Sequence, residues 1–73
     1  MIEAYITALK PPEVAAEVEA ARRGGCMTFR LRAVDGGGML DQERLGAARY
    51  AAGIQSRVEL DLAVVEPGAA RRR

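Results

Sequence analysis

Residues 53–65, G-I-Q-S-R-V-E-L-D-L-A-V-V, carry the pattern that decides the fold. The two sets of alternating side chains are Val58, Leu60, Leu62 and Val64 on one side, and Arg57, Glu59, Asp61 and Ala63 on the other. A period of two is typical of a β-strand with one face on a hydrophobic core and the other toward water or a partner. We therefore predict a half-buried strand here, and the rest of the chain must complete its core.

Two earlier segments predict further strands. Ile2–Leu9 and Cys26–Val34 both alternate between apolar and polar side chains. The first ends at Lys10-Pro11-Pro12, where proline lacks the N–H that a strand ladder needs. The second ends at the Asp35-Gly36-Gly37-Gly38 turn signal.

Two helices are predicted between these strands. In Glu13–Arg23 the apolar residues fall on one helical face, and Gly24-Gly25 follows as a stop. In Gln42–Ala52 the same spacing recurs, with Asp41 as the expected N-cap. Gly53 is expected to end this second helix, and Ile54 to make the apolar contact that accompanies such an ending.

The element order is therefore β-α-β-α-β, which predicts an α+β fold: a two-layer α/β sandwich of a three-stranded sheet with two helices on one face. Residues 1–66 are expected to form a single domain, and residues 67–73 a disordered basic tail. The second and third strands are predicted neighbours because their outward charges are complementary. Those charges are Arg30 and Arg32 on one strand, and Glu59 and Asp61 on the other.

Right-handed crossovers would make this sheet parallel, and parallel sheets are seldom open to water on one face. Three arrangements resolve the conflict: the outer face stacks on a second copy, another chain extends the sheet, or one crossover hides an antiparallel partner. In the parallel arrangement a protein-interaction surface is expected at the carboxyl ends of the strands. Its residues would be Tyr5, Leu9, Arg30, Arg32, Val34 and Val65. The competing interpretation is scattered exposed hydrophobic residues, which are normal on a protein surface.

The distribution of charge gives little support for binding to nucleic acid. The net charge is +1, and three of the basic residues are the terminal Arg71, Arg72 and Arg73. Without them, eight basic residues face ten acidic ones, so the folded body is acidic rather than basic. The terminal arginines are candidate contacts for nucleic acid or an acidic partner, or else a solvated tail. A single cysteine and the lack of a signal-peptide or membrane-span pattern favour a cytoplasmic location.

Few residues offer chemistry. The chain has no histidine, which removes His-based metal sites and serine or cysteine catalysis assisted by imidazole. Cys26 follows a predicted helix C-terminus, which disfavours a reactive thiolate, so a buried or incidental cysteine is expected. The loop Gly36–Gly38 sits where phosphate-binding loops occur but lacks their lysine and serine or threonine. A flexible connection is the preferred interpretation, and an anion site stays open.

The sequence therefore predicts a non-enzymatic protein without cofactor or metal. The leading hypothesis is an accessory, assembly or regulatory module that binds another protein, or itself as a homo-oligomer, through the outer sheet face or an edge strand. The alternative is nucleic-acid binding through the arginine tail together with Arg30 and Arg32.

Overall fold

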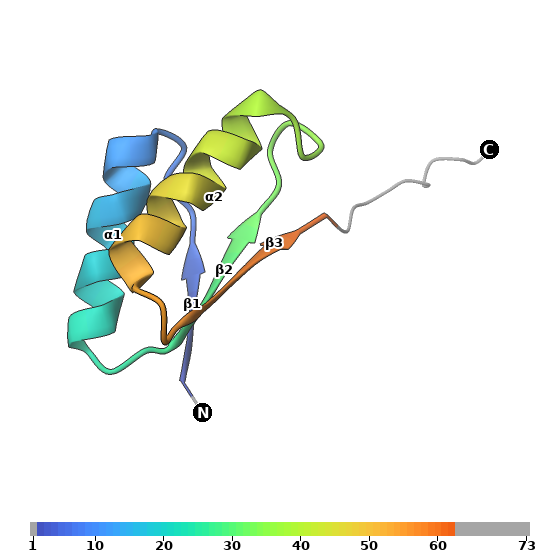
Figure 1. Cartoon of the computed structure of the whole chain (residues 1–73). Coiled ribbons are helices and arrows are strands. Elements are labelled where there is room, and N and C mark those ends of the chain that lie inside the picture. Colours follow the sequence, from blue (N-terminus) through green and yellow to red (C-terminus); the bar gives the residue numbers. More distant parts are fainter. Residues whose placement is uncertain (1, 63–73) are drawn as a thin grey trace.

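The computed structural model describes residues 2–62, in which strands and helices alternate as β-α-β-α-β (Figure 1). The strands are β1 (Glu3–Ile6), β2 (Thr28–Arg32) and β3 (Arg57–Asp61), and the helices are α1 (Pro11–Arg23) and α2 (Met39–Ala52). The predicted element order and the α+β class are confirmed, although α1 and α2 begin two and three residues before their predicted starts at Glu13 and Gln42. β1 and β2 are shorter than their alternating segments because only part of each segment pairs with a neighbouring strand among residues 2–62.

The sheet has the order β1-β2-β3, and both pairs of strands are parallel. The antiparallel arrangement is therefore excluded for the described strands. In the register, Tyr5 and Glu59 both lie beside Arg30 of the central strand. Both helices cover the same face of the sheet (Figure 1). The predicted neighbours β2 and β3 are confirmed as adjacent.

The core lies between the sheet and the two helices. Phe29 and Leu31 of β2 and Ile6 of β1 are buried on the helix side of the sheet. The buried helix residues are small or β-branched: Val14 and Val18 on α1, and Ala48, Ala51 and Ala52 on α2. Alanines in this position let α2 pack closely on its neighbours, at the cost of little hydrophobic area per residue. Leu45 adds one larger side chain to the same helix face.

The predicted start of α2 is wrong. The helix begins at Met39 with Gly38 as its N-cap, so Asp41 lies inside the first turn. Capping falls to Asp35 instead, whose carboxylate accepts hydrogen bonds from the backbone N–H groups of Leu40 and Asp41. A residue in the preceding loop thus satisfies the orphan donors that a local N-cap was expected to satisfy.

The predicted end of α2 is half right. Gly53 does end the helix, with a positive φ of 85°. Ile54 makes no apolar contact with the helix, because its residue surface is 100% exposed. The extended ψ of 167° at Gly53 carries the chain away toward β3 rather than back over the last turn. At the end of α1 the positive φ falls on Gly25, at 97°.

Candidate functional site

The sheet has one face that no described element covers. Both helices pack on the opposite face (Figure 1). We call this uncovered side the outer face, and its side chains, which are exposed or half-exposed, are Glu3, Tyr5, Arg30, Arg32, Arg57, Glu59 and Asp61. The predicted division into a core side and a charged side is confirmed for most strand residues. Two residues depart from it: Leu62, predicted on the core side, is 57% exposed, and Thr28, which alternation places on the same side as Arg30, is buried.

Arg30 occupies the middle of the outer face. Its Nη1 lies 2.8 Å from Glu59 Oε1, and its Nε lies 3.3 Å from Glu3 Oε1. The hydrogen bond and charge of Glu3, with the charge of Glu59, raise the pKa of Arg30 above its ordinary value. The predicted pairing of Arg30 with Glu59 is confirmed, and Arg32 stands opposite Asp61 in the same register. Charges on the centre of this face are thus balanced across three strands.

The structure brings only some of the predicted interaction residues together. Tyr5 is 67% exposed, and together with Arg32 and Val34 it lines one cleft. Leu9 is also exposed, but it does not belong to the lining of that cleft. Val65 and the terminal Arg71, Arg72 and Arg73 lie outside the described residues. The structure therefore brings three of the six residues of the predicted surface together in one hollow.

This hollow, which we call the β1–β2 cleft, lies where the first two strands end. Its lining consists of Tyr5, Ile6, Thr7, Arg32, Val34 and Arg44, and its volume is about 390 Å³. Clefts of a few hundred Å³ with apolar walls and few polar groups are the usual form of a binding site. The carboxyl ends of parallel strands are also where open α/β sheets bind ligands.

A buried ion pair that the sequence did not predict lies below the cleft. Arg44 Nη1 is 2.9 Å from Asp41 Oδ1, and the two side chains are only 1% and 0% exposed. Arg44 also donates to the carbonyl oxygens of Ala8 and Arg32, from Nε at 3.0 Å and from Nη1 at 2.9 Å. The pair therefore joins α2 to the chain leaving β1 and to the end of β2.

The Asp41 carboxylate is held by the loop in front of α2. Backbone N–H groups of Val34, Asp35 and Gly37 donate to it at 2.8–3.1 Å. Burial alone would raise the pKa of Asp41, but these hydrogen bonds favour the ionised form and together bring the pKa well below its usual range. Asp41 is therefore a fixed negative charge beneath the cleft.

One feature of the sequence does point to this pair. Arg44 falls beside Leu45 on the helix face that carries Ala48 and Ala52, where a charged residue needs a partner if it is buried. Asp41 is the acidic residue three positions earlier, within reach along a helix. A basic residue on the apolar face of a predicted helix, with an acid one turn before it, is the signal that was missed.

The glycine loop is not an empty anion cradle. Gly37 N–H donates to Asp41 at 2.8 Å, and Gly38 N–H donates to Asp35 at 3.0 Å. The donors that would bind a phosphate in such a loop are therefore taken by the protein's own carboxylates. Two side chains hold the loop in place, so the interpretation as a merely flexible connection is incomplete.

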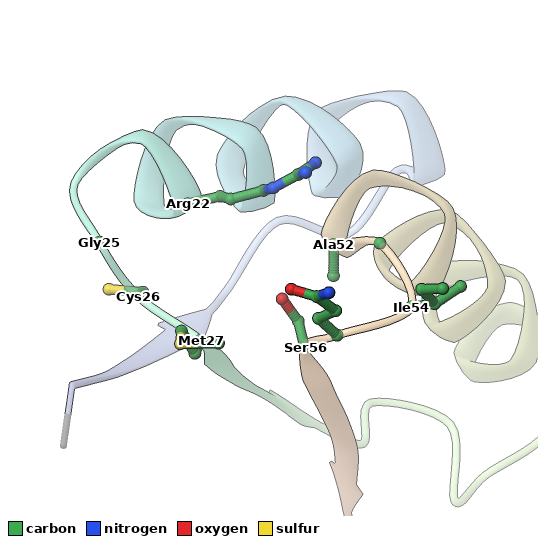
Figure 2. A pocket seen from close by; sticks show the side chains of 9 residues that line it. Arg22, Gly25, Cys26, Met27, Ala52, Ile54 and Ser56 are labelled. Carbon is green, nitrogen blue, oxygen red and sulfur yellow. The ribbon is translucent and has the colours of Figure 1, made fainter.

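A second hollow lies at the opposite end of the sheet, where α1 and α2 both end (Figure 2). Arg22 crosses from α1 to α2 here and donates from Nη1 to the Ala51 carbonyl oxygen at 3.0 Å. Cys26 is partly buried against the core, and its sulfur is turned away from Ser56 (Figure 2). Among the described residues, neither a histidine nor an acidic side chain lines this hollow, so the part of the chain that the structure describes supplies no general base to Cys26 or Ser56 there.

Within residues 2–62, no three histidine, cysteine, aspartate or glutamate side chains come together in a way that would hold a metal ion. Neither helix of that part of the chain is long and apolar enough to cross a membrane. No family model, no curated protein and no solved structure matches this chain. A proposal about its function must therefore stand on the geometry of the two sheet features, the outer face and the β1–β2 cleft.

Proposed function

We propose that this protein is a non-enzymatic interaction module that binds another protein, or a second copy of itself, through the outer face of its sheet. The observation that carries the proposal is a parallel sheet whose outer face is not covered by any helix or strand of residues 2–62 (Figure 1). Parallel sheets are normally covered on both faces. A partner bound on the outer face would cover the second face of this sheet, as is usual for parallel sheets.

The composition of the outer face suits a protein partner. Tyr5 is a large, amphipathic side chain exposed beside the central strand, and tyrosine is enriched at the centres of protein interfaces. Arg30 is already paired with Glu3 and Glu59. A partner that buries these three side chains would therefore not have to neutralise an unpaired charge. Such a face fits a polar, charge-balanced interface.

The same pairing weighs against nucleic acid as the partner of this face. Phosphate binding needs basic groups that are free to replace counterions, and Arg30 is engaged by two carboxylates. Tyr5 is the one aromatic side chain on the outer face of the described strands, which gives little for bases to stack on. A cytoplasmic setting completes the proposal, because the chain has a single cysteine.

The proposal is tested by charge substitution at Tyr5 with a matched tyrosine as control. Tyr5→Glu places a charge on the outer face beside Arg30, whereas Tyr50→Glu places it on α2, where Tyr50 is 90% exposed on the helix layer. Sedimentation equilibrium of the full chain measures self-association. We expect a dimer or larger assembly that Tyr5→Glu dissociates and Tyr50→Glu leaves intact.

If the chain is a monomer, the second arm compares what the two variants capture from the native host. A protein retained by the wild type and by Tyr50→Glu, and lost with Tyr5→Glu, supports a foreign partner on the outer face. A monomer whose captured proteins are the same for all three chains would contradict the proposal. Circular dichroism of both variants confirms that the fold is kept.

A further inference from the structure

Arg44 has donors that the protein does not use. A guanidinium carries five N–H groups, of which one is on Nε and two are on each Nη atom. Nε donates to Ala8, and Nη1 donates to Arg32 and Asp41. The hydrogen bonds of Arg44 within residues 2–62 thus come from Nε and Nη1 and leave Nη2 unused, although the Arg44 side chain is only 1% exposed. A buried donor without an acceptor is costly, so an acceptor from outside the chain is expected.

The place for that acceptor is the β1–β2 cleft. Arg44 and Arg32 both form part of its lining. The other walls are largely apolar and come from Tyr5, Ile6 and Val34. A ligand that fills the cleft therefore meets cationic donors at one end and hydrocarbon over the rest of its surface.

The charge around Arg44 favours a singly charged guest. Asp41 lies 2.9 Å from the guanidinium and already offsets its charge, so a dianion such as a phosphate monoester would be only partly balanced. The nearby backbone N–H groups of Thr7 and Ala8, which could have bound further phosphate oxygens, donate to Glu17 Oε1 at 3.2 and 3.1 Å. A carboxylate, which carries a single negative charge and can accept a charge-assisted hydrogen bond from Nη2 alone, matches this donor set better.

We propose that the β1–β2 cleft binds a carboxylate carried on a small apolar body, with Arg44 and Arg32 as its donors and Tyr5, Ile6 and Val34 around the apolar part. The cleft does not depend on the proposed function, because a free acid can fill it whether or not a protein covers the outer face. The shared chemistry has two sources: a small organic acid, or an acidic side chain next to an apolar residue in a polypeptide.

The test uses 3-phenylpropanoate as the probe and 3-phenylpropanamide as its uncharged match. Two-dimensional ¹H–¹⁵N spectra of the full chain follow the side-chain Nε–H signal of Arg44 and the backbone signal of Val34. We expect both signals to shift saturably with the acid at millimolar concentration and to stay in place with the amide. Shifts of equal size with acid and amide, or no shift at Arg44, would overturn the proposal.

Two variants separate binding from folding. Val34→Trp narrows the cleft from an exposed position, and Met39→Trp adds the same side chain to an exposed site on α2 outside the cleft. We expect Val34→Trp to weaken acid binding at least tenfold and Met39→Trp to leave it unchanged. Equal binding by both variants would show that the acid lies elsewhere and would refute the assignment.

The source of the carboxylate is distinguished with two short peptides, acetyl-Leu-Glu-amide and acetyl-Leu-Gln-amide. Tighter binding of the glutamate peptide than of 3-phenylpropanoate, with the same loss in Val34→Trp, assigns the cleft to an acidic polypeptide segment. Tighter binding of the free acid assigns it to a small molecule. Failure of both probes at Arg44 would remove the site and leave the self-association test of the outer face untouched.

Discussion

Arg44 and Asp41 lie one turn apart on α2 and form an ion pair of 2.9 Å that is closed to solvent on both sides. Arg44 holds the carbonyl oxygens of Ala8 and Arg32, and Asp41 holds the backbone N–H of Val34. These contacts tie the start of one helix to the carboxyl ends of two strands. The pair therefore fixes the shape of the β1–β2 cleft as well as the attachment of α2.

Asp41→Asn is expected to be strongly destabilising. The amide removes the charge that balances buried Arg44 and directs an NH₂ group toward backbone donors. Breaking one side of a buried ion pair costs about 3–5 kcal/mol. A domain of this length has only about 4–11 kcal/mol of stability at typical values per residue. Urea unfolding followed by circular dichroism should show a large fall in the midpoint.

Glu43→Gln is the matched control, because it removes a carboxylate from an exposed position on the same helix. Its free energy of unfolding should stay within about 0.5 kcal/mol of the wild type. Asp41→Asn with an equally small effect would mean that the ion pair does not hold α2 to the sheet.

Acid should destabilise the fold through Asp41. Hydrogen bonds hold the pKa of Asp41 below that of an unfolded aspartate, which is about 3.9. The unfolded chain therefore binds the proton first, and the stability contributed by this group is complete above about pH 4 and is lost as the pH falls further. Urea unfolding from pH 7 to pH 3 should show no loss from this group until the acidic end.

The carboxyl group that causes the loss of stability in acid can be identified by NMR. A ¹³C titration of the side-chain carboxyls should find the midpoint of Asp41 below that of an unfolded aspartate, which is about 3.9. A midpoint for Asp41 close to 4 would contradict the hydrogen-bonded geometry described above.

The period-two pattern was enough to predict the strands and the partner of Arg30. Alternation put Arg30 and Glu59 on one face of neighbouring strands, and parallel register then placed them opposite each other. Local spacing also put Val14 and Val18 on the buried side of α1. These features follow from chain geometry over a few residues, so the sequence alone contains them.

The role of Asp41 is not local, and for that reason it was missed. As an acid before an apolar helical pattern it satisfies the rule for an N-cap. Its three backbone donors come from the loop after β2, and its charged partner is a buried arginine whose position depends on β1 and β2. Only the path of the loop decides that Asp35 caps the helix while Asp41 turns inward.

Glu17 is expected to stabilise the end of β1. Its Oε1 accepts the backbone N–H groups of Thr7 and Ala8, which have left the ladder of the sheet. Glu17→Ala leaves both donors to solvent and should lower the free energy of unfolding by about 1 kcal/mol, because the site is only partly buried. Glu17→Gln keeps an acceptor oxygen, so it should lower the free energy of unfolding clearly less than Glu17→Ala does. Equal losses for the two variants, by urea unfolding, would show that the hydrogen bonds contribute nothing.

Two glycines should respond in opposite directions to the same substitution. Gly46 lies inside α2, and apart from its chain neighbours and the nearby backbone of its own helix, no atom of the described residues is within 4 Å of the Cβ that alanine would add. Gly46→Ala should therefore stabilise the protein by about 0.5–1 kcal/mol, since alanine loses less conformational freedom in a helix.

Gly37→Ala should destabilise the protein by about 1–2 kcal/mol, because a residue with a side chain is strained at its φ of +87°. The added Cβ would also lie 3.1 Å from Leu62 Cδ2, which would have to move. Thermal and urea unfolding of both variants measure the two shifts. A stabilising Gly37→Ala would mean that the loop does not hold the conformation in which Gly37 donates to Asp41, and the buried charge would then have one fewer donor than the structure gives it.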